Sequence, residues 1–423
     1  MKRMLCRAVL TAVGLFAAAA VCAQGATFSQ IQRGRYLSKA GDCTSCHTAK
    51  GGEPFAGGYP MATPFGIIYS PNITPDLQTG IGKWSGDDFF QAMHKGIRRD
   101  GQYLYPACPY PWFTRLTRTD VDALKSYLDT LAPVRQENKS NELPWPLSWR
   151  AVMAGWNMLF FHEGTYVTDS AKSEVWNRGA YLVQGAGHCA ACHTPKNMLG
   201  ASKDGLHLQG GDAGESWFAP SLANDQRDGI GKWTTKDIVE YLKSGANRET
   251  AAAGPMTDVV MNSTQYLSDT DLDAVAVYLK DLPATGRDKQ AGKAQVGESV
   301  MNHGRGLYMD NCIGCHMAHG EGLEHVFPRL KASASIQAEN ASSLIQVVLT
   351  GDRMADPPVK PTGLAMPAFG AKLSDSEIAD LLNYIRNAWG NQAPLVDSDD
   401  VAKVRNDVKE FGPRHSRQLS AAQ

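Results

Sequence analysis

The sequence predicts a mainly α-helical protein that contains three tandem copies of one small domain. The motif Cys-x-x-Cys-His occurs three times, at 43–47, 189–193 and 312–316. A similar short segment precedes each motif, at 33–37, 178–182 and 304–308, and a segment with helical apolar spacing follows it, at 116–128, 267–279 and 373–385. Repetition of these features in one order indicates a repeated domain. The 423 residues leave room for about three domains of ordinary size.

Each repeat is expected to begin and end with a helix. The closing segments start with polar residues, and the pairs Ser268–Asp271 and Ser374–Glu377 resemble N-terminal capping boxes. Similar apolar spacing that ends at a glycine predicts a middle helix at 88–96, 237–245 and 343–351. Each domain would then consist of a helix, the Cys-x-x-Cys-His loop, irregular chain and a closing helix.

The Cys-x-x-Cys-His motif is the attachment signature of a c-type haem. Its two thiols form thioethers with the haem, and the adjacent imidazole binds the iron. One copy could arise by chance or form half of a zinc or thiol redox site, but three copies in one repeated context favour three covalent haems. The attachment residues would be Cys43, Cys46, Cys189, Cys192, Cys312 and Cys315, and the iron ligands His47, His193 and His316. The expected fold is therefore three class I-like cytochrome c domains.

The N-terminus has the pattern of a secretory signal. Lys2, Arg3 and Arg7 precede an apolar run at 8–21 that is too short for a confident membrane span. Small residues around Cys22 predict cleavage after Ala23, with a lipoprotein site at Cys22 as the weaker alternative. Export would place the haem protein on the oxidising, periplasmic side of the membrane.

The remaining chain divides into domains and linkers. We expect a signal at 1–23, domain 1 at 27–137, an aromatic-rich linker at 138–170, domain 2 at 171–284, a linker at 285–297, domain 3 at 298–392 and a tail at 393–423. Lys and Arg number 42 against 43 Asp and Glu, and no basic stretch suggests nucleic-acid binding. No later apolar run is long enough to indicate a membrane span.

A haem that only transfers electrons needs a sixth iron ligand, and methionine is a common choice. In the third repeat Met366 lies just before the closing helix, whereas Met317 touches the haem motif and Met354 is a weaker rival. In the second repeat Met256 holds the corresponding place, with Met261 as its rival. We therefore expect Met256 and Met366 to bind iron.

The first repeat departs from this pattern. The corresponding place holds Cys108, which is followed by a proline as Met366 is. A cysteine sulfur as axial ligand would lower the haem potential relative to methionine. The alternative is that Cys108 is a buried free thiol. The sixth ligand of the first haem would then be Met93 or the neighbouring His94, or the haem would have no sixth ligand.

Other residues near the haems can also be assigned expected roles. A proline follows each motif, and the carbonyls of Pro71, Pro220 and Pro328 could accept the Nδ1–H of the three motif histidines and fix the rings. Arg98, Arg248 and Arg353 follow the middle helices and could meet haem propionates or lie exposed in loops. Trp84 and Trp233 precede the first two middle helices, where core packing is the preferred interpretation.

The linker between the first two repeats is rich in Trp, Met and Phe over 143–161, and it is too polar to span a bilayer. Contact with a membrane surface or a quinone is one interpretation. Packing between haem domains or against a partner subunit is the other. The polar tail after Gly390 is expected to lie on a surface or fray.

At this point a family resemblance is apparent. The first repeat runs Arg-Gly-x-Tyr-Leu, Cys-x-x-Cys-His, Thr-Pro-Phe-Gly, Asn-Ile-Thr-Pro and Gly-Ile-Gly-Lys-Trp. With Gly254-Pro-Met256 and Met366-Pro-Ala-Phe-Gly370, it resembles the triheme cytochrome c subunit of membrane-bound bacterial alcohol, gluconate, sorbitol and fructose dehydrogenases. The family pattern carries methionine where Cys108 stands.

The resemblance implies an electron-transfer subunit with no catalytic residues of its own. It would take electrons from a catalytic subunit that uses PQQ or FAD, with or without a small accessory subunit, and pass them through three haems to ubiquinone. It would attach peripherally to the periplasmic face of the inner membrane. The alternatives are a self-contained, peroxidase-like haem enzyme with an open iron, or a free soluble carrier. The sequence does not name the substrate of the partner.

Overall fold

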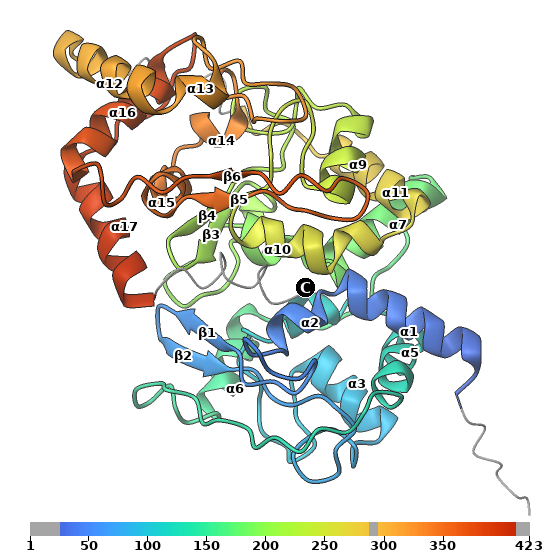
Figure 1. Cartoon of the computed structure of the whole chain (residues 1–423). Coiled ribbons are helices and arrows are strands. Elements are labelled where there is room, and N and C mark those ends of the chain that lie inside the picture. Colours follow the sequence, from blue (N-terminus) through green and yellow to red (C-terminus); the bar gives the residue numbers. More distant parts are fainter. Residues whose placement is uncertain (1–25, 287–294, 412–423) are drawn as a thin grey trace, which may run out of the picture.

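The computed structural model describes residues 26–286 and 295–411. It contains three mainly helical domains in chain order, as predicted. Domain 1 occupies the lower half of Figure 1, with helices α1, α3 and α5, and domains 2 and 3 lie above it. The predicted signal segment lies outside the described residues.

Each domain is built on two helices that cross in close contact. The pairs are α1 (Phe28–Ala40) with α5 (Arg118–Leu128), α7 (Glu174–Tyr181) with α11 (Asp269–Lys280), and α12 (Glu298–Asn311) with α16 (Asp375–Asn387). A Cβ atom on Gly34, Gly179 or Gly304 would lie 1.9, 1.9 or 2.2 Å from a backbone oxygen of the facing helix. Only glycine permits this approach, so these residues determine how closely the helices cross.

The same glycines give the register between the repeats. Gly304 is structurally equivalent to Gly34, whereas the sequence comparison placed it opposite Arg33, so that register is wrong by one residue. In the sequence register Arg305 would occupy the place of Gly34, and the close contact of Gly304 with the closing helix excludes this. Gly306 therefore stands where domain 1 has Tyr36.

The predicted middle helices are present. They are α3 (Gly86–Lys95), α9 (Thr235–Ser244) and α15 (Ser342–Thr350). Each ends at a glycine with a φ between 65 and 78°, namely Gly96, Gly245 and Gly351. Trp84 and Trp233 pack against the cores of their domains, as expected.

Short elements complete the domains. The haem motifs form single turns, α2 (Cys43–Cys46), α8 (Ala190–His193) and α13 (Ile313–His316). Three antiparallel pairs are β1 (Pro60–Thr63) with β2 (Gly66–Tyr69), β3 (Gly211–Gly214) with β4 (Trp217–Ala219), and β5 (Asp352–Arg353) with β6 (Ala365–Met366). The other elements are α4 (Tyr110–Phe113), α6 (Val152–Phe160), η1 (Leu182–Ala186), η2 (Asp204–Leu206), α10 (Pro255–Asn262), η3 (Thr264–Tyr266), α14 (Ala334–Gln337) and α17 (Ser398–Phe411). Helix α17 lies in the predicted tail, packs against α15 and α16, and buries Val401 and Val404.

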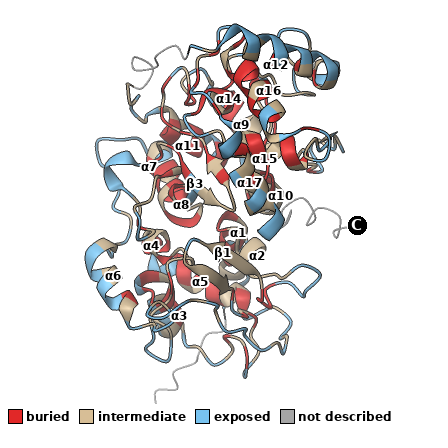
Figure 2. Cartoon of the chain, turned by 90° about the vertical axis from the view of Figure 1, so that its left-hand side faces the viewer, coloured by how far each residue is buried: buried red, intermediate tan, exposed pale blue. Residues whose placement is uncertain are grey.

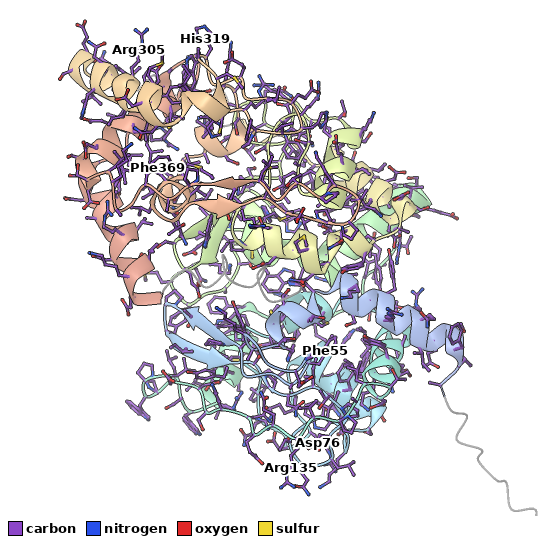
Figure 3. All side chains as sticks on the ribbon, viewed as in Figure 1. Phe55, Asp76, Arg135, Arg305, His319 and Phe369 are labelled. Carbon is purple, nitrogen blue, oxygen red and sulfur yellow. The ribbon has the colours of Figure 1, made fainter. Side chains whose placement is uncertain are left out.

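The core of domain 1 continues into domain 2. Leu37 and Phe55 of domain 1 belong to one buried cluster with Leu267 and Leu272 of domain 2. Domain 3 has its own cluster, against which Phe369 packs. Figure 3 shows Phe55 and Phe369 in opposite halves of the molecule. Domains 1 and 2 are therefore joined by a common cluster, although domain 2 also has a cluster of its own. Domain 3 is built around a separate core and meets domain 2 in a small cluster of Ala252, Val260 and Ala355.

A tyrosine of domain 1 caps a helix of domain 2. The Tyr36 hydroxyl donates to Asp271 Oδ2 at 2.5 Å and accepts from the Ser268 N–H at 3.2 Å. Asp271 also accepts two hydrogen bonds of 2.7 Å from Arg178. The capping box predicted at Ser268–Asp271 is therefore only half present, since Tyr36 takes the place of the reciprocal bond.

The same arrangement occurs in the opposite direction. The Tyr181 hydroxyl of domain 2 donates to Asp120 Oδ2 at 2.5 Å and accepts from the Thr117 N–H at 3.1 Å. Asp120 also pairs with Arg33 of its own domain. Each domain thus gives the other the same contacts that it receives. Such reciprocal contacts are typical of two domains related by an approximate twofold axis. We call these two sets the tyrosine clamp.

Domain 3 has no such tyrosine. Its closing helix starts with the predicted capping box, in which the Ser374 N–H donates to Glu377 Oε2 at 2.8 Å and the Glu377 N–H donates to Ser374 Oγ at 3.3 Å. The third domain therefore caps its own helix, whereas the first two domains cap each other.

Candidate haem sites

The three motif histidines share one geometry. Their Nδ1 atoms lie 2.8, 2.7 and 2.9 Å from the carbonyl oxygens of Pro71, Pro220 and Pro328, which confirms the expected pairing. A carbonyl only accepts, so each Nδ1 carries the proton and Nε2 keeps its lone pair for a metal. Burial lowers the pKa of each ring, although the proline carbonyl acts in the opposite direction. Each imidazole is therefore held in a fixed orientation with Nε2 available for a metal.

The motif cysteines are free thiols without a zinc-type ligand set. Burial raises the pKa of Cys43 to about 11 and that of Cys189 to about 12. Within 26–286 and 295–411, no group of three or more His, Cys, Asp or Glu residues could hold a metal ion. Two neutral thiols next to one oriented imidazole fit covalent haem attachment and do not fit a zinc site.

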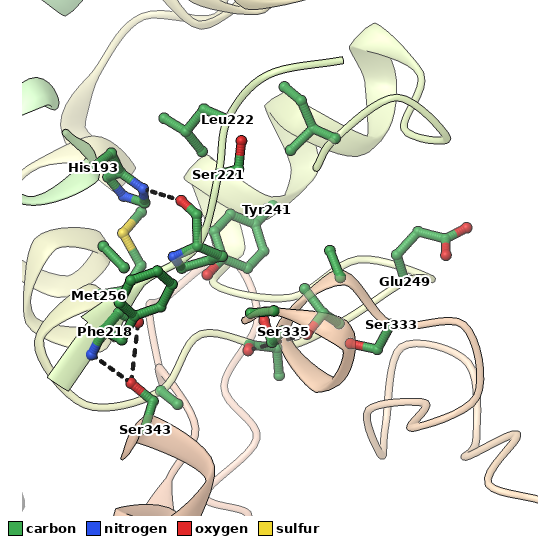
Figure 4. A pocket seen from close by; sticks show the side chains of 18 of the residues that line it. His193, Phe218, Ser221, Leu222, Tyr241, Glu249, Met256, Ser333, Ser335 and Ser343 are labelled. Atoms are coloured by element: carbon green, nitrogen blue, oxygen red, sulfur yellow. Dashed lines mark hydrogen bonds between the residues drawn. The ribbon is translucent and has the colours of Figure 1, made fainter. Parts of the chain in front are cut away.

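The sites of domains 2 and 3 open into one cavity of about 410 Å³. Its lining includes Cys189, Cys192, His193 and Met256 from domain 2, and Cys312, His316 and Met366 from domain 3. Apolar residues of both cores, such as Leu222 and Ile336, line the space around these donors. Figure 4 shows this region, where the domain 3 segment at 333–343 lies beside the domain 2 pocket. An apolar cavity that presents thiols, imidazoles and thioethers fits haem at both sites.

The structure separates Met256 from its rival. Met256 lies in the first turn of α10 and lines the cavity with His193. Met261 does not line it; its sulfur accepts the Asp356 N–H at 3.3 Å, and its side chain packs with Ala355 at the contact between domains 2 and 3. The geometry therefore favours Met256.

Met366 is likewise separated from Met354 and Met317. Met366 belongs to β6 and lines the cavity with His316. Met354 is absent from the cavity wall, and its N–H donates to the Leu364 carbonyl at 3.0 Å. Met317 follows the motif directly, where its carbonyl accepts from the Tyr308 hydroxyl.

Cys108 lies against the first haem motif. Its thiol is near enough to Cys43 and Cys46 to interact with them electrostatically, although they precede it by 65 and 62 positions in the chain. Burial raises the pKa of Cys108 to about 12. The preceding turn, closed by the Cys108 N–H to the Tyr105 carbonyl at 3.0 Å, fixes the backbone there. Cys108 therefore remains a candidate ligand for a haem bound at the first motif.

The rivals of Cys108 lie on helix α3. His94 is 4 % exposed, and its Nε2 lies 2.9 Å from the Leu116 carbonyl. Its ring stacks on Phe90 at 4.4 Å, so His94 is used in packing. Met93 packs against the shared core of domains 1 and 2. His94 is thus engaged by its own helix and by Leu116, whereas Met93 packs in the cluster that also includes Cys43.

The arginines singled out in the sequence do not line the cavity. Arg248 pairs with Asp237 at 2.9 Å, and Arg98 pairs with Asp100 at 3.0 Å. Arg353 lies in β5 and is exposed. Two other arginines, which sequence reasoning missed, do line the cavity. Arg227 donates to the carbonyls of Gln337 and Gln392 at 3.0 Å, and Arg329 pairs with Glu249 at 3.3 Å. The position of Arg329 directly after Pro328 was the available signal.

Comparison with known proteins agrees with this arrangement. The family model described as "Cytochrome c" matches residues 31–132, 177–283 and 301–389, which are the three helical domains. The gluconate 2-dehydrogenase cytochrome c subunit of Pantoea cypripedii is 43% identical and aligns with 93% of this chain and 94% of its own length.

Two further relatives have similar names. The cytochrome c subunit of the quinone alcohol dehydrogenase of Gluconobacter oxydans (strain 621H) is 40% identical over 93% of this chain and 86% of its own length. The fructose dehydrogenase cytochrome subunit of Gluconobacter japonicus is 38% identical over 89% and 82%. The three matched segments, the oriented histidines and these relatives together show that the chain belongs to the cytochrome c family and carries c-type haem for electron transfer.

Proposed function

We propose that this chain carries three c-type haems and is the electron-transfer subunit of a dehydrogenase complex. The observation that carries the proposal is the threefold repetition of one site, with a Cys-x-x-Cys-His turn and an imidazole oriented by a proline carbonyl at 2.7 to 2.9 Å. The named relatives are cytochrome subunits of gluconate, alcohol and fructose dehydrogenases. The catalytic partner would be a PQQ or FAD protein, with or without a small accessory subunit.

We propose one ligand set for the three haems. The three pairs of motif cysteines attach the haems, and the imidazoles provide one axial ligand each. Met256 and Met366 provide the second ligand in domains 2 and 3, and Cys108 provides it in domain 1. Haem supplies reversible one-electron chemistry at its iron, while the chain orients the ligands and excludes water from the sites. A thiolate in domain 1 would make that haem the one with the lowest potential.

The shared cavity supports direct electron exchange between domains 2 and 3. Donor side chains from both sites line one space, so the two haems would lie close together without a separating domain wall. Domain 1 is joined to domain 2 by a common buried cluster and by the tyrosine clamp. These contacts hold the haem site of domain 1 at a fixed distance from the site of domain 2.

An apolar surface around α6 supports contact with the membrane and with ubiquinone. Met158 is 82% exposed and Trp145 83%, and α6 is pale blue over much of its length in Figure 2. Trp156 Nε1 donates to the Leu199 carbonyl at 3.0 Å and so joins α6 to the loop with Met198, which is 94% exposed. In the described part of the chain, no helix is both long enough and apolar enough to cross a bilayer. We infer peripheral attachment at the periplasmic face of the inner membrane.

One experiment separates the candidate functions. The purified, haem-loaded protein should contain three haems per chain, all low-spin, and should co-purify from membranes with a larger dehydrogenase subunit. Reduction by that subunit and reoxidation by a ubiquinone analogue would support the proposal. A high-spin haem that binds carbon monoxide would favour the peroxidase-like alternative, and a protein that is soluble and unpartnered in extracts would favour the free carrier.

A further inference from the structure

Strand β4 of domain 2 is fixed by a side chain of domain 3. The Phe218 N–H donates to Ser343 Oγ at 2.7 Å, and the Ser343 hydroxyl donates to the Phe218 carbonyl at 3.0 Å. Figure 4 shows both bonds between the strand and helix α15. A hydroxyl can accept and donate at the same time, so one serine satisfies both backbone groups on this edge of the strand.

Other residues beyond domain 2 hold the same hairpin. With its amide oriented to satisfy both partners, Gln346 donates to the Glu215 carbonyl and accepts from Trp217 Nε1, both at 2.9 Å. The Ser216 hydroxyl donates to Asp407 Oδ2 of α17 at 2.5 Å. The β3–β4 hairpin is therefore held along its length by α15 and α17.

This hairpin ends at the group that orients the second haem histidine. Pro220 directly follows β4, and its carbonyl lies 2.7 Å from His193 Nδ1. Because Pro220 is the residue that continues β4, a displacement of the strand moves this carbonyl relative to His193. Only Ala219 lies between Phe218, which Ser343 binds, and Pro220.

Domain 1 holds its equivalent strand in another way. Strand β2 precedes Pro71 and is bound by the linker: the Ile67 N–H donates to the Glu142 carbonyl at 3.0 Å, and the Glu142 N–H donates back at 2.8 Å. In domain 3, the segment before Pro328 is closed locally, by the Leu323 N–H to the Phe327 carbonyl at 3.0 Å. Side chains next to Pro328 also contact domain 2, where His325 pairs with Glu240 at 2.9 Å and Arg329 with Glu249 at 3.3 Å. Among the described residues before the three prolines, Phe218 is the one whose backbone N–H and carbonyl are both bound by another haem domain.

We propose that Ser343 is a positioning residue for His193, which acts through β4 and the Pro220 carbonyl. Docking of domain 3 thereby sets the strength of the hydrogen bond to the proximal ligand of the second haem. The inference rests on the proposed haem ligation by His193. A firm Nδ1–H···O=C bond raises the basicity of the imidazole and stabilises ferric iron, so it lowers the reduction potential. Loosening the strand raises that potential.

The test is a spectroelectrochemical titration of the full, haem-loaded chain. Ser343→Ala removes both bonds to Phe218, Ser343→Thr retains the hydroxyl, and Ser342→Ala changes the preceding residue of the same helix as a matched control. Met256→His identifies the second haem, because a change of its axial ligand shifts that potential alone.

The expected result is a higher potential for the second haem in Ser343→Ala, with the other two potentials unchanged. Ser343→Thr and Ser342→Ala should both give wild-type potentials. An unchanged second potential in Ser343→Ala, or an equal shift of all three haems, would overturn the proposal. Failure of the proposed function looks different, since the unsubstituted protein would then lack three low-spin haems. If Ser343→Ala does not fold, Gln346→Ala provides the same readout from the neighbouring contact.

Discussion

All three domains have the same fold, but the contact between domains 1 and 2 differs from the contact between domains 2 and 3. The first two domains share a core and cap each other's closing helices through Tyr36 and Tyr181. Domain 3 has its own core and caps its own helix, and it holds domain 2 by the β3–β4 hairpin. Similar local sequence patterns therefore give a symmetric pair in domains 1 and 2 and a separately built domain 3. The difference follows the presence of one tyrosine, which domain 3 replaces with Gly306.

The largest effect should come from removing a haem from each region. Cys312→Ala with Cys315→Ala should lower the haem content by about one third and should affect domain 2 only weakly, because domains 2 and 3 share only a small buried cluster. The matched pair Cys43→Ala with Cys46→Ala should destabilise domain 2 as well. Haem content and limited proteolysis measure both outcomes. Equal protease sensitivity of domain 2 in the two variants would contradict the comparison.

The carboxylates of the tyrosine clamp should be the next most sensitive. Asp271→Ala leaves Arg178 and Tyr36 without their partner and should lower the free energy of unfolding of the domain pair by about 3 kcal/mol. Glu377→Ala removes only a local cap in domain 3 and should cost less. Thermal unfolding followed by circular dichroism tests this, and a larger loss for Glu377→Ala would refute the assignment.

The two tyrosines should contribute equally. Tyr36→Phe and Tyr181→Phe each remove one hydroxyl that both donates and accepts, so each should cost about 1 kcal/mol. Tyr127→Phe on α5 is the control, because no hydrogen bond of its hydroxyl is seen among the described contacts. Chemical denaturation measures the three values. Strongly unequal losses for the two tyrosines would mean that the contacts are not symmetric in energy.

The smallest effect concerns pH. Burial raises the pKa of Asp271, but hydrogen bonds from Arg178 and Tyr36 outweigh it, so the folded-state pKa lies below the ordinary 3.8. Its contribution to stability is therefore complete above that value and is lost as pH falls through the folded-state pKa. Asp271→Asn should flatten the decline in unfolding temperature below about pH 4. A decline as steep as that of the unsubstituted protein would show that other groups cause it.

Much of this architecture could be predicted from the sequence. The Cys-x-x-Cys-His motifs, the closing helices and the histidine–proline pairs are local patterns, and their spacing carries the information. The register at Gly304 and the split capping box at Ser268 could not be predicted, because both depend on contacts with other segments. Arg227 was missed for the same reason, since it binds carbonyls that lie more than 100 residues away.

All three sites are proposed to bind haem iron through the motif histidine. They differ in the second ligand, which is methionine in domains 2 and 3 and Cys108 in domain 1. Electron paramagnetic resonance of the oxidised, haem-loaded chain tests this most directly. We predict three low-spin ferric signals, two of the histidine–methionine type and one of the histidine–thiolate type that changes to the former in Cys108→Met. A high-spin signal, or a first-haem signal that Cys108→Met leaves unaltered, would contradict the account.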